Sequence, residues 1–187
     1  HTSLGRIPLA DGVTVCSRFF QEKYGGIIVP HGRDAAHLDP ERFDSLSLKR
    51  REELEHRKVI LFLGTPQPHK GLQDLVEAFV SISDPSMALL LVGVDPQKPP
   101  AYLRLAHEGI LLKRGCSWEQ LPEFLAMADL VVIPQRRHQI SLGQMPAKLT
   151  DAMAMAKPII ASAVSDIPEY LQGRGYTFEP GNVRELA

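Results

Sequence analysis

The segment KVILFLGTPQPHKGLQDLVEAFV, residues 58–80, decides the fold because it contains a complete strand–turn–helix unit. Residues 58–64 are a continuous apolar run that ends in glycine, which is typical of a strand buried on both faces of a parallel sheet. After a proline-rich turn, apolar side chains recur at helical spacing, at Leu72, Leu75, Val76, Phe79 and Val80. The segment therefore predicts a buried strand followed by an amphipathic helix.

The same unit recurs toward the end of the chain. Further strands are predicted at residues 87–93, 109–113, 129–134, 158–162 and 176–179, and helices at 102–108, 118–128, 146–156 and 167–171. This alternation predicts an α/β fold, with a Rossmann-like doubly wound parallel sheet that has helices on both faces. Because ligands of such sheets bind at the carboxyl ends of the strands, a site is expected in the loops after Gly64, Gly93, Lys113 and Pro134.

The residues before this region have a different texture. Segments 12–17 and 26–32 are strand-like, and residues 33–43 predict a loop. The stretch 47–58 is dense in charges of both signs, which favours a solvated helix or a linker. A domain boundary is therefore expected near residue 47.

The composition indicates a soluble globular protein. The chain has 187 residues, 44% hydrophobic and 23% charged, with a formal net charge of -1. This near-neutral balance argues against a nucleic-acid partner. Two cysteines cannot build a disulfide framework, and no apolar run approaches the roughly 18 residues of a membrane span. Since no secretory signal is present either, a cytoplasmic location is expected, or the inner face of a membrane for the full-length protein.

The turn after the first predicted strand carries a candidate anion site. Residues 64–71 read GTPQPHKG, so Lys70 and Gly71 open the helix that follows. A helix N-terminus offers unpaired backbone N–H groups and a partial positive charge, and a lysine beside it suits a phosphate. The order of a Walker loop is absent. The alternative is an ordinary surface lysine.

A second candidate lies at residues 141–154, SLGQMPAKLTDAMA. Pro146 suits the first helical position, so the backbone amides of Leu142, Gly143 and Gln144 are expected to point out of the helix start. Lys148 and Asp151 share one helix face, where a carboxylate can accept from the vicinal hydroxyls of a ribose. The alternative is a surface ion pair worth about 0.2–0.5 kcal/mol.

A third element, Gly115-Cys116-Ser117, lies between a predicted strand and a predicted helix. A nucleobase fits against the backbone amides of such a loop. Ser117 with Gln120 also matches a helix capping box, and Cys116 suits simple packing. The seven histidines are scattered without metal-ligand spacing, so no metal site is predicted.

Several longer patterns follow one another in a fixed order. Residues 64–79 combine G-x-x-x-x-x-K-G with L-x-x-L-V-x-A-F, and residues 91–93 end in V-G. Residues 121–134 read L-P-x-x-x-x-x-A-D-L-x-V-x-P, and residues 146–162 read P-x-K-L-x-D-x-M-A-x-x-K-P-I-I-A-S. The shorter patterns are I-P-E at 167–169, P-G-N at 180–182, A-D-x-V-x-x-x-S at 10–17 and G-x-D-x-x-x-x-x-P at 32–40.

These patterns together resemble the C-terminal, donor-binding half of GT-B glycosyltransferases, specifically glycosyltransferase family 4 (group 1). The resemblance implies that residues 1–47 are the tail of an N-terminal GT-B domain with its interdomain linker. Residues 48–187 are then a truncated nucleotide-sugar-binding domain. The missing N-terminal domain is the expected partner, and the fragment alone is expected to be inactive.

The implied reaction is transfer of a sugar from a UDP-, GDP- or ADP-sugar to an acceptor, with retention and without a metal or other cofactor. Lys70 and Asp151 are implied as catalytic residues, Lys70 on the diphosphate and Asp151 on the ribose. The implied nucleotide-sugar-binding residues are Gly64, Thr65, Lys70, Gly115, Cys116, Ser117, Leu142, Gly143, Gln144, Lys148 and Asp151.

Three positions depart from the family pattern. Many members have an arginine where this chain has Thr65, and Arg136 or Arg137 is a candidate to compensate. Gly143 stands where the E-x7-E pair has its first acid, and Asp151, at the second, is one methylene shorter than glutamate. Two alternatives stay open: a degenerate GT-B half kept for binding or assembly, which Thr65 and Gly143 favour, and an enzyme of the sugar-nucleotide 2-epimerase type, which shares the GT-B architecture.

Overall fold

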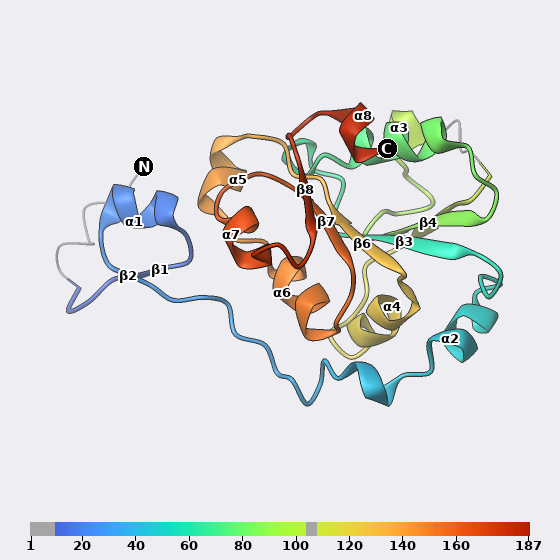
Figure 1. Cartoon of the computed structure of the whole chain (residues 1–187), viewed down its shortest axis with the longest axis horizontal. Helices are drawn as coiled ribbons and strands as arrows, with labels where there is room; N and C mark the ends of the chain where they lie inside the picture. The colour runs from blue at the N-terminus through green and yellow to red at the C-terminus, as the bar shows by residue number, and fades with distance from the viewer. Residues whose placement is uncertain (1–9, 104–107) are drawn as a thin grey trace.

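The computed structural model describes residues 10–103 and 108–187 (Figure 1). Within these ranges a six-stranded sheet runs in the order β5-β4-β3-β6-β7-β8, and every neighbouring pair is parallel. The strands are β3 (Lys58–Leu63), β4 (Met87–Val92), β5 (Ile110–Lys113), β6 (Leu130–Ile133), β7 (Ile159–Ser162) and β8 (Tyr176–Phe178). The order reverses between β3 and β6, which makes the edge beyond these two strands the expected ligand site.

Alternating side chains of each strand enter two separate cores. Val59, Leu61 and Leu63 of β3 pack on one face with α2 (Ser45–Arg51), α4 (Leu121–Met127), α6 (Ala147–Ala154) and α7 (Ile167–Leu171). Ile60 and Phe62 pack on the other face with α3 (Leu72–Ile82) and α8 (Val183–Leu186). The period of two along a strand produces this division. The prediction of a doubly wound α/β fold is confirmed.

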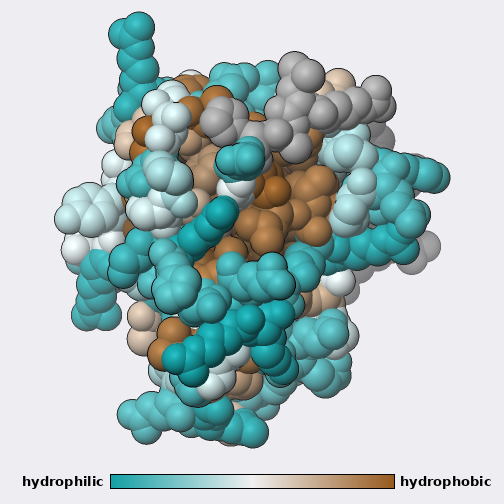
Figure 2. Space-filling view, turned by 90° about the vertical axis from the view of Figure 1, so that its right-hand side faces the viewer, coloured by the Kyte–Doolittle hydropathy of each residue, from teal (hydrophilic) through white to brown (hydrophobic). Residues whose placement is uncertain are grey.

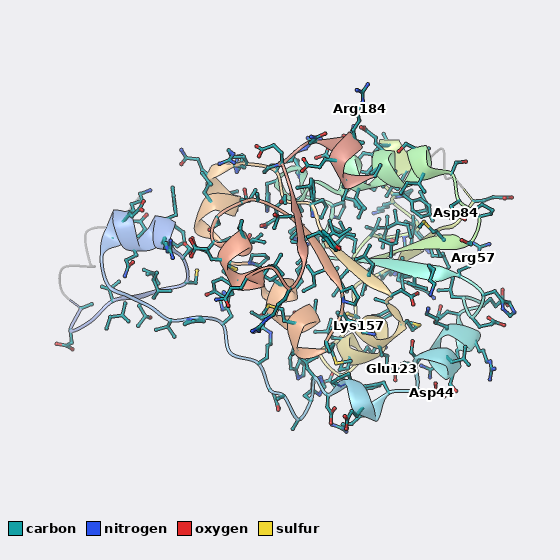
Figure 3. All side chains as sticks on the ribbon, in the orientation of Figure 1. Asp44, Arg57, Asp84, Glu123, Lys157 and Arg184 are labelled. Carbon is teal, nitrogen blue, oxygen red and sulfur yellow. The ribbon has the colours of Figure 1, made fainter. Side chains whose placement is uncertain are left out.

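The two helical layers are visible in the side-chain view. The labelled Asp44 and Glu123 lie with α2 and α4 below the sheet, whereas Arg184 lies with α8 above it (Figure 3). The face seen in Figure 2 is largely hydrophilic, with an apolar area near its centre. In the described ranges, no helix combines the length and the apolar character that crossing a membrane requires.

Residues 10–44 lie beside the large sheet rather than within it (Figure 1). A parallel pair, β1 (Thr14–Val15) and β2 (Ile27–Ile28), flanks the helix α1 (Arg18–Tyr24). An irregular segment and the short 3-10 helix η2 (Pro40–Arg42) then lead to α2. The predicted boundary at residue 47 falls inside α2, which is packed into the larger unit through Leu48.

The remaining differences from the sequence expectations are local. The helix expected over 118–128 begins at Leu121, because residues 117–120 form a turn and Pro122 occupies the first turn of α4. The helix expected over 102–108 is replaced at its start by the 3-10 helix η4 (Ala101–Leu103), and residues 104–107 of it lie outside the described residues. Helices α1, α5 (Gln139–Gly143) and α8 were not predicted.

Candidate functional site

A cavity of about 290 Å³ opens at the carboxyl ends of β3, β4 and β5. Six of the residues singled out in the sequence line it: Gly64, Thr65, Gly115, Cys116, Lys148 and Asp151. The other lining residues are Leu63, Val92, Gly93 and Leu121. Helix α6 contributes Lys148 and Asp151 to this cavity. The structure therefore brings together residues from the loops after β3, β4 and β5 and from α6, which are far apart in the sequence.

The ammonium groups of two lysines meet at the end of β3. A Cβ atom placed on Gly64 would lie 3.4 Å from Nζ of Lys70 and 3.6 Å from Nζ of Lys148. Lys70 donates a 2.9 Å hydrogen bond to Oγ1 of Thr65. Burial lowers the pKa of Lys70. Two cations and a glycine without a side chain leave a concave, positively charged corner that suits an anion.

Lys148 is held more deeply than Lys70. Its Nζ donates a 2.9 Å hydrogen bond to the carbonyl oxygen of Leu63 and lies 4.3 Å from the ring centroid of Phe62. Burial, with a smaller contribution from the positive charge of Lys70, lowers the pKa of Lys148 to about 7. The ammonium is therefore poised between its charged and neutral forms at neutral pH.

The turn that carries Lys70 is held against the end of β6. Gly71 has a φ of 65°, and a Cβ atom there would lie 1.7 Å from the carbonyl oxygen of Pro134. The amide of Arg136 donates a 2.9 Å hydrogen bond to the carbonyl oxygen of His69. Only glycine permits this close approach. The β3 and β6 loops are thereby joined at the point where the strand order reverses.

Asp151 is nearly buried and already has a partner. Its Oδ1 accepts a hydrogen bond from Nε of Arg33, which belongs to the irregular segment after β2. Burial raises the pKa of the Asp151 carboxyl, while the hydrogen bond and charge of Arg33, and the nearby His31, act in the opposite direction. Sequence reasoning missed Arg33. The available signal was a charged residue at the second position of the linker pattern at 32–40.

The predicted nucleobase loop follows β5. Gly115 and Cys116 line the cavity, and burial raises the pKa of the Cys116 thiol. The amide of Ser117 donates a 3.1 Å hydrogen bond to Oε1 of Gln120, which is one half of the predicted capping box. Trp118, the next residue, stacks on His37 with the ring centroids 4.5 Å apart. A second residue of the segment after β2 thus contacts the rim of the site.

The stretch from Leu142 to Gln144 is arranged differently from the sequence expectation. Pro146 is the N-cap of α6 and not its first helical residue, while Leu142 and Gly143 end the separate helix α5. The amide of Leu142 donates to the carbonyl oxygen of His138 and is not free. A role of this stretch in holding phosphate stays a prediction.

Gly143, where the family pattern has its first acid, is covered by α1. A Cβ atom on Gly143 would lie 2.3 Å from the ring of Phe20. Its carbonyl oxygen accepts a 3.0 Å hydrogen bond from Oγ of Ser17. A side chain at this position, including an acid, would therefore require the Phe20 ring to move away from Gly143.

The arginines considered as substitutes at Thr65 are engaged elsewhere. Arg136 forms a two-pronged ion pair with Asp74 of α3, in which Nε lies 2.8 Å from Oδ2. The exposed Arg137 lies 3.7 Å from Glu179. The second cation beside Lys70 is therefore Lys148. In the part of the chain that the structure describes, no three potential metal ligands cluster together.

The chain belongs to the family described as Glycosyl transferases group 1, which matches residues 57–187. The parallel six-stranded sheet flanked by helices matches the Rossmann-like domains of GT-B glycosyltransferases. Across solved structures, the chain superposes on Anabaena HepE in complex with UDP-glucose with a TM-score of 0.79 and 19% identity, covering 100% of this chain and 57% of the other. At 19% identity, this similarity shows a shared fold only.

Curated relatives are more similar in sequence. The chain is 28% identical over 200 aligned residues to the GDP-mannose-dependent alpha-(1-6)-phosphatidylinositol monomannoside mannosyltransferase of Mycolicibacterium smegmatis. That alignment covers 97% of this chain and 52% of the relative. The chain is also 31% identical over 156 residues to the D-inositol 3-phosphate glycosyltransferase of Corynebacterium efficiens. This second alignment covers 75% of this chain and 35% of the relative. The chain thus spans about half, or less, of the length of these relatives.

Proposed function

We propose that the cavity beyond β3 binds the diphosphate of a nucleotide-sugar and that the full-length protein is a retaining, metal-independent glycosyltransferase. The observation that carries this proposal is the meeting of the Lys70 and Lys148 ammonium groups at Gly64. A carboxylate, Asp151, stands in the same cavity. This combination of cations and one acceptor matches a diphosphate joined to a ribose.

The chemical task of these residues is to stabilise a leaving group. Negative charge builds on the diphosphate as its bond to the sugar breaks, and preorganised cations lower the energy of that state. Lys70 and Lys148 supply this charge from two sides of Gly64. Asp151 would accept from the ribose hydroxyls, and the loop at Gly115 would face the base. In this scheme the protein's own cations take the place of a divalent metal.

Known relatives support a nucleotide-sugar as the ligand without selecting the nucleotide. The name of the mycobacterial relative specifies GDP-mannose, and the HepE structure holds UDP-glucose. The cavity offers backbone and small side chains where a base would lie, so UDP, GDP and ADP are all candidates.

The length of the relatives supports a division of labour within the full-length protein. In this proposal the unit that begins with α2 (Ser45–Arg51) supplies the donor site, and the residues before α2 are the end of an acceptor-binding domain and its linker. Because one relative is nearly twice as long as the aligned part, acceptor recognition is assigned to a further domain. This chain alone is therefore expected to bind donor without transferring sugar.

A second candidate is a degenerate half that retains the fold for binding or assembly. Thr65 in place of a cation, and the Phe20 ring over Gly143, favour this candidate. Calorimetric titration of the chain with UDP, GDP and ADP separates the two. Binding of one nucleotide in the micromolar-to-millimolar range supports the donor site, whereas binding of none overturns it and leaves the degenerate half.

A further inference from the structure

Arg33 is fixed by three hydrogen bonds although it belongs to an irregular segment. Nε donates to Oδ1 of Asp151, Nη2 donates to the carbonyl oxygen of Ala147 at 3.0 Å, and Nη1 donates to that of Gly32 at 2.7 Å. Only 19% of its side chain is exposed. A guanidinium that uses each nitrogen in this way is held in one orientation.

This arrangement leaves part of the Asp151 carboxylate available. Within residues 10–103 and 108–187, Oδ2 of Asp151 accepts no hydrogen bond, while the residue lines the cavity. We propose that Arg33 is a positioning residue that turns Asp151 so that Oδ1 is occupied and Oδ2 is presented to the ribose hydroxyls of the donor. This inference rests on the function proposed above.

The physical need for a partner comes from the burial of Asp151. A carboxylate removed from water favours its neutral acid form unless a cation or a hydrogen-bond donor accompanies it. Only the ionised form offers charge-assisted hydrogen bonds to both ribose hydroxyls. Arg33 supplies both the charge and the donor.

The segment that carries Arg33 has a second anchor on the site. His37 stacks on Trp118 and its Nε2 lies 2.9 Å from the carbonyl oxygen of Trp118, next to the loop at Gly115. The segment between β2 and η2 therefore contacts α6 through Arg33 and the loop after β5 through His37. Both contacts fix the path of the backbone from which Arg33 reaches Asp151.

The test measures how strongly the protein distinguishes a ribose from a sugar without hydroxyls. Calorimetry compares the nucleoside diphosphate that binds wild type with its 2′,3′-dideoxy counterpart, for wild type, R33M, R33K and R51M. Wild type is expected to prefer the ribose form about tenfold, in the range of a charge-assisted contact. R33M is expected to reduce this preference to about twofold or less, and R33K to restore part of it because it keeps the charge.

R51M is the matched control, because Arg51 is an exposed arginine paired with Glu123 on the α2–α4 side. It is expected to keep the wild-type preference. An unchanged preference in R33M, or tighter binding of the ribose form by R33M, overturns the positioning role while leaving the proposed function intact. Absence of any nucleotide binding by wild type overturns both. If circular dichroism shows that R33M does not fold, the R33K variant provides the test. A preference of R33K for the ribose form as large as that of wild type would contradict the proposal that the guanidinium of Arg33 orients Asp151.

Discussion

The Nζ of Lys148 donates a 2.9 Å hydrogen bond to the carbonyl oxygen of Leu63, the last residue of β3. This bond links α6, which connects β6 to β7 in one half of the sheet, to β3, which begins the other half. It places an ammonium beside Gly64, at the point where the strand order reverses. The chemistry proposed for the cavity depends on that charge, and so do its clearest tests.

Nucleotide binding is expected to weaken as the pH rises. The pKa of Lys148 is lowered to about 7, so its ammonium is mostly charged at pH 6 and mostly neutral at pH 8. If the charged form is required, affinity falls about tenfold between these values. Calorimetry of wild type and K148M at both pH values checks this. The comparison cancels the ionisation of the phosphate itself, and an equal pH dependence in both proteins would contradict the role of Lys148.

The same group makes stability depend on pH in a defined direction. Because the folded protein holds Lys148 at a pKa of about 7, below the ordinary lysine value of 10.5, the unfolded chain binds more protons between these values. The free energy of unfolding therefore increases as the pH rises from 7 toward 10.5. From pH 7 to 9 the gain is up to about 2 kcal/mol relative to K148M. Urea unfolding of both proteins at several pH values measures this gain. The same pH dependence of the free energy of unfolding in wild type and K148M would contradict the prediction.

Substitution of Lys70 is expected to weaken donor binding. K70A removes one of the two cations at Gly64 and should reduce affinity for the bound nucleotide about tenfold or more, roughly 1.4 kcal/mol. K58A is the matched control, since Lys58 begins β3 at the end opposite Gly64 and is exposed. Similar losses in both variants would show that the effect is not specific to the cavity.

Gly71 should not tolerate a side chain. An alanine Cβ would lie 1.7 Å from the carbonyl oxygen of Pro134, and φ is 65°. G71A must therefore shift the junction between the β3 and β6 loops, at an expected cost of about 2–3 kcal/mol in unfolding free energy. G12A is the control, because nothing lies within 4 Å of a Cβ there. Chemical denaturation compares them, and a G71A variant as stable as G12A would refute this packing.

The ion pair between Arg136 and Asp74 is expected to hold the β6 loop on α3. Asp74 is 4% exposed, so R136M leaves a carboxylate buried without its cation. Because Arg136 itself is partly exposed, the loss is expected to be about 1–3 kcal/mol. The double variant D74N/R136M should lose less than the sum of the single changes. Strict additivity in denaturation experiments would mean that the two side chains do not interact.

Local patterns were sufficient for the sheet and for the edge at which the cavity opens. Residues 58–64 predicted β3 to within one residue, because the five residues that follow Lys58 are all apolar and buried, as in a strand covered on both faces of a parallel sheet. The loops after such strands share one edge, so the loops that follow Gly64 and Lys113 could be assigned to that edge in advance. Lys148 lies on α6, and its place in the site was expected from the family resemblance. Helix α1 escaped prediction because none of its residues is buried, which leaves little apolar periodicity to recognise.

The sequence by itself determined the alternation of strands and helices, the two-sided core and the edge where a ligand would bind, since each follows from hydrophobic periodicity along the chain. Tertiary structure alone decided the partners of the polar groups. Arg33 meets Asp151 across 118 positions, Phe20 covers Gly143, and Arg136 pairs with Asp74 instead of standing in at Thr65. Such contacts depend on the paths of irregular segments through space. The local sequence around a charged residue does not indicate which distant residue its side chain will contact.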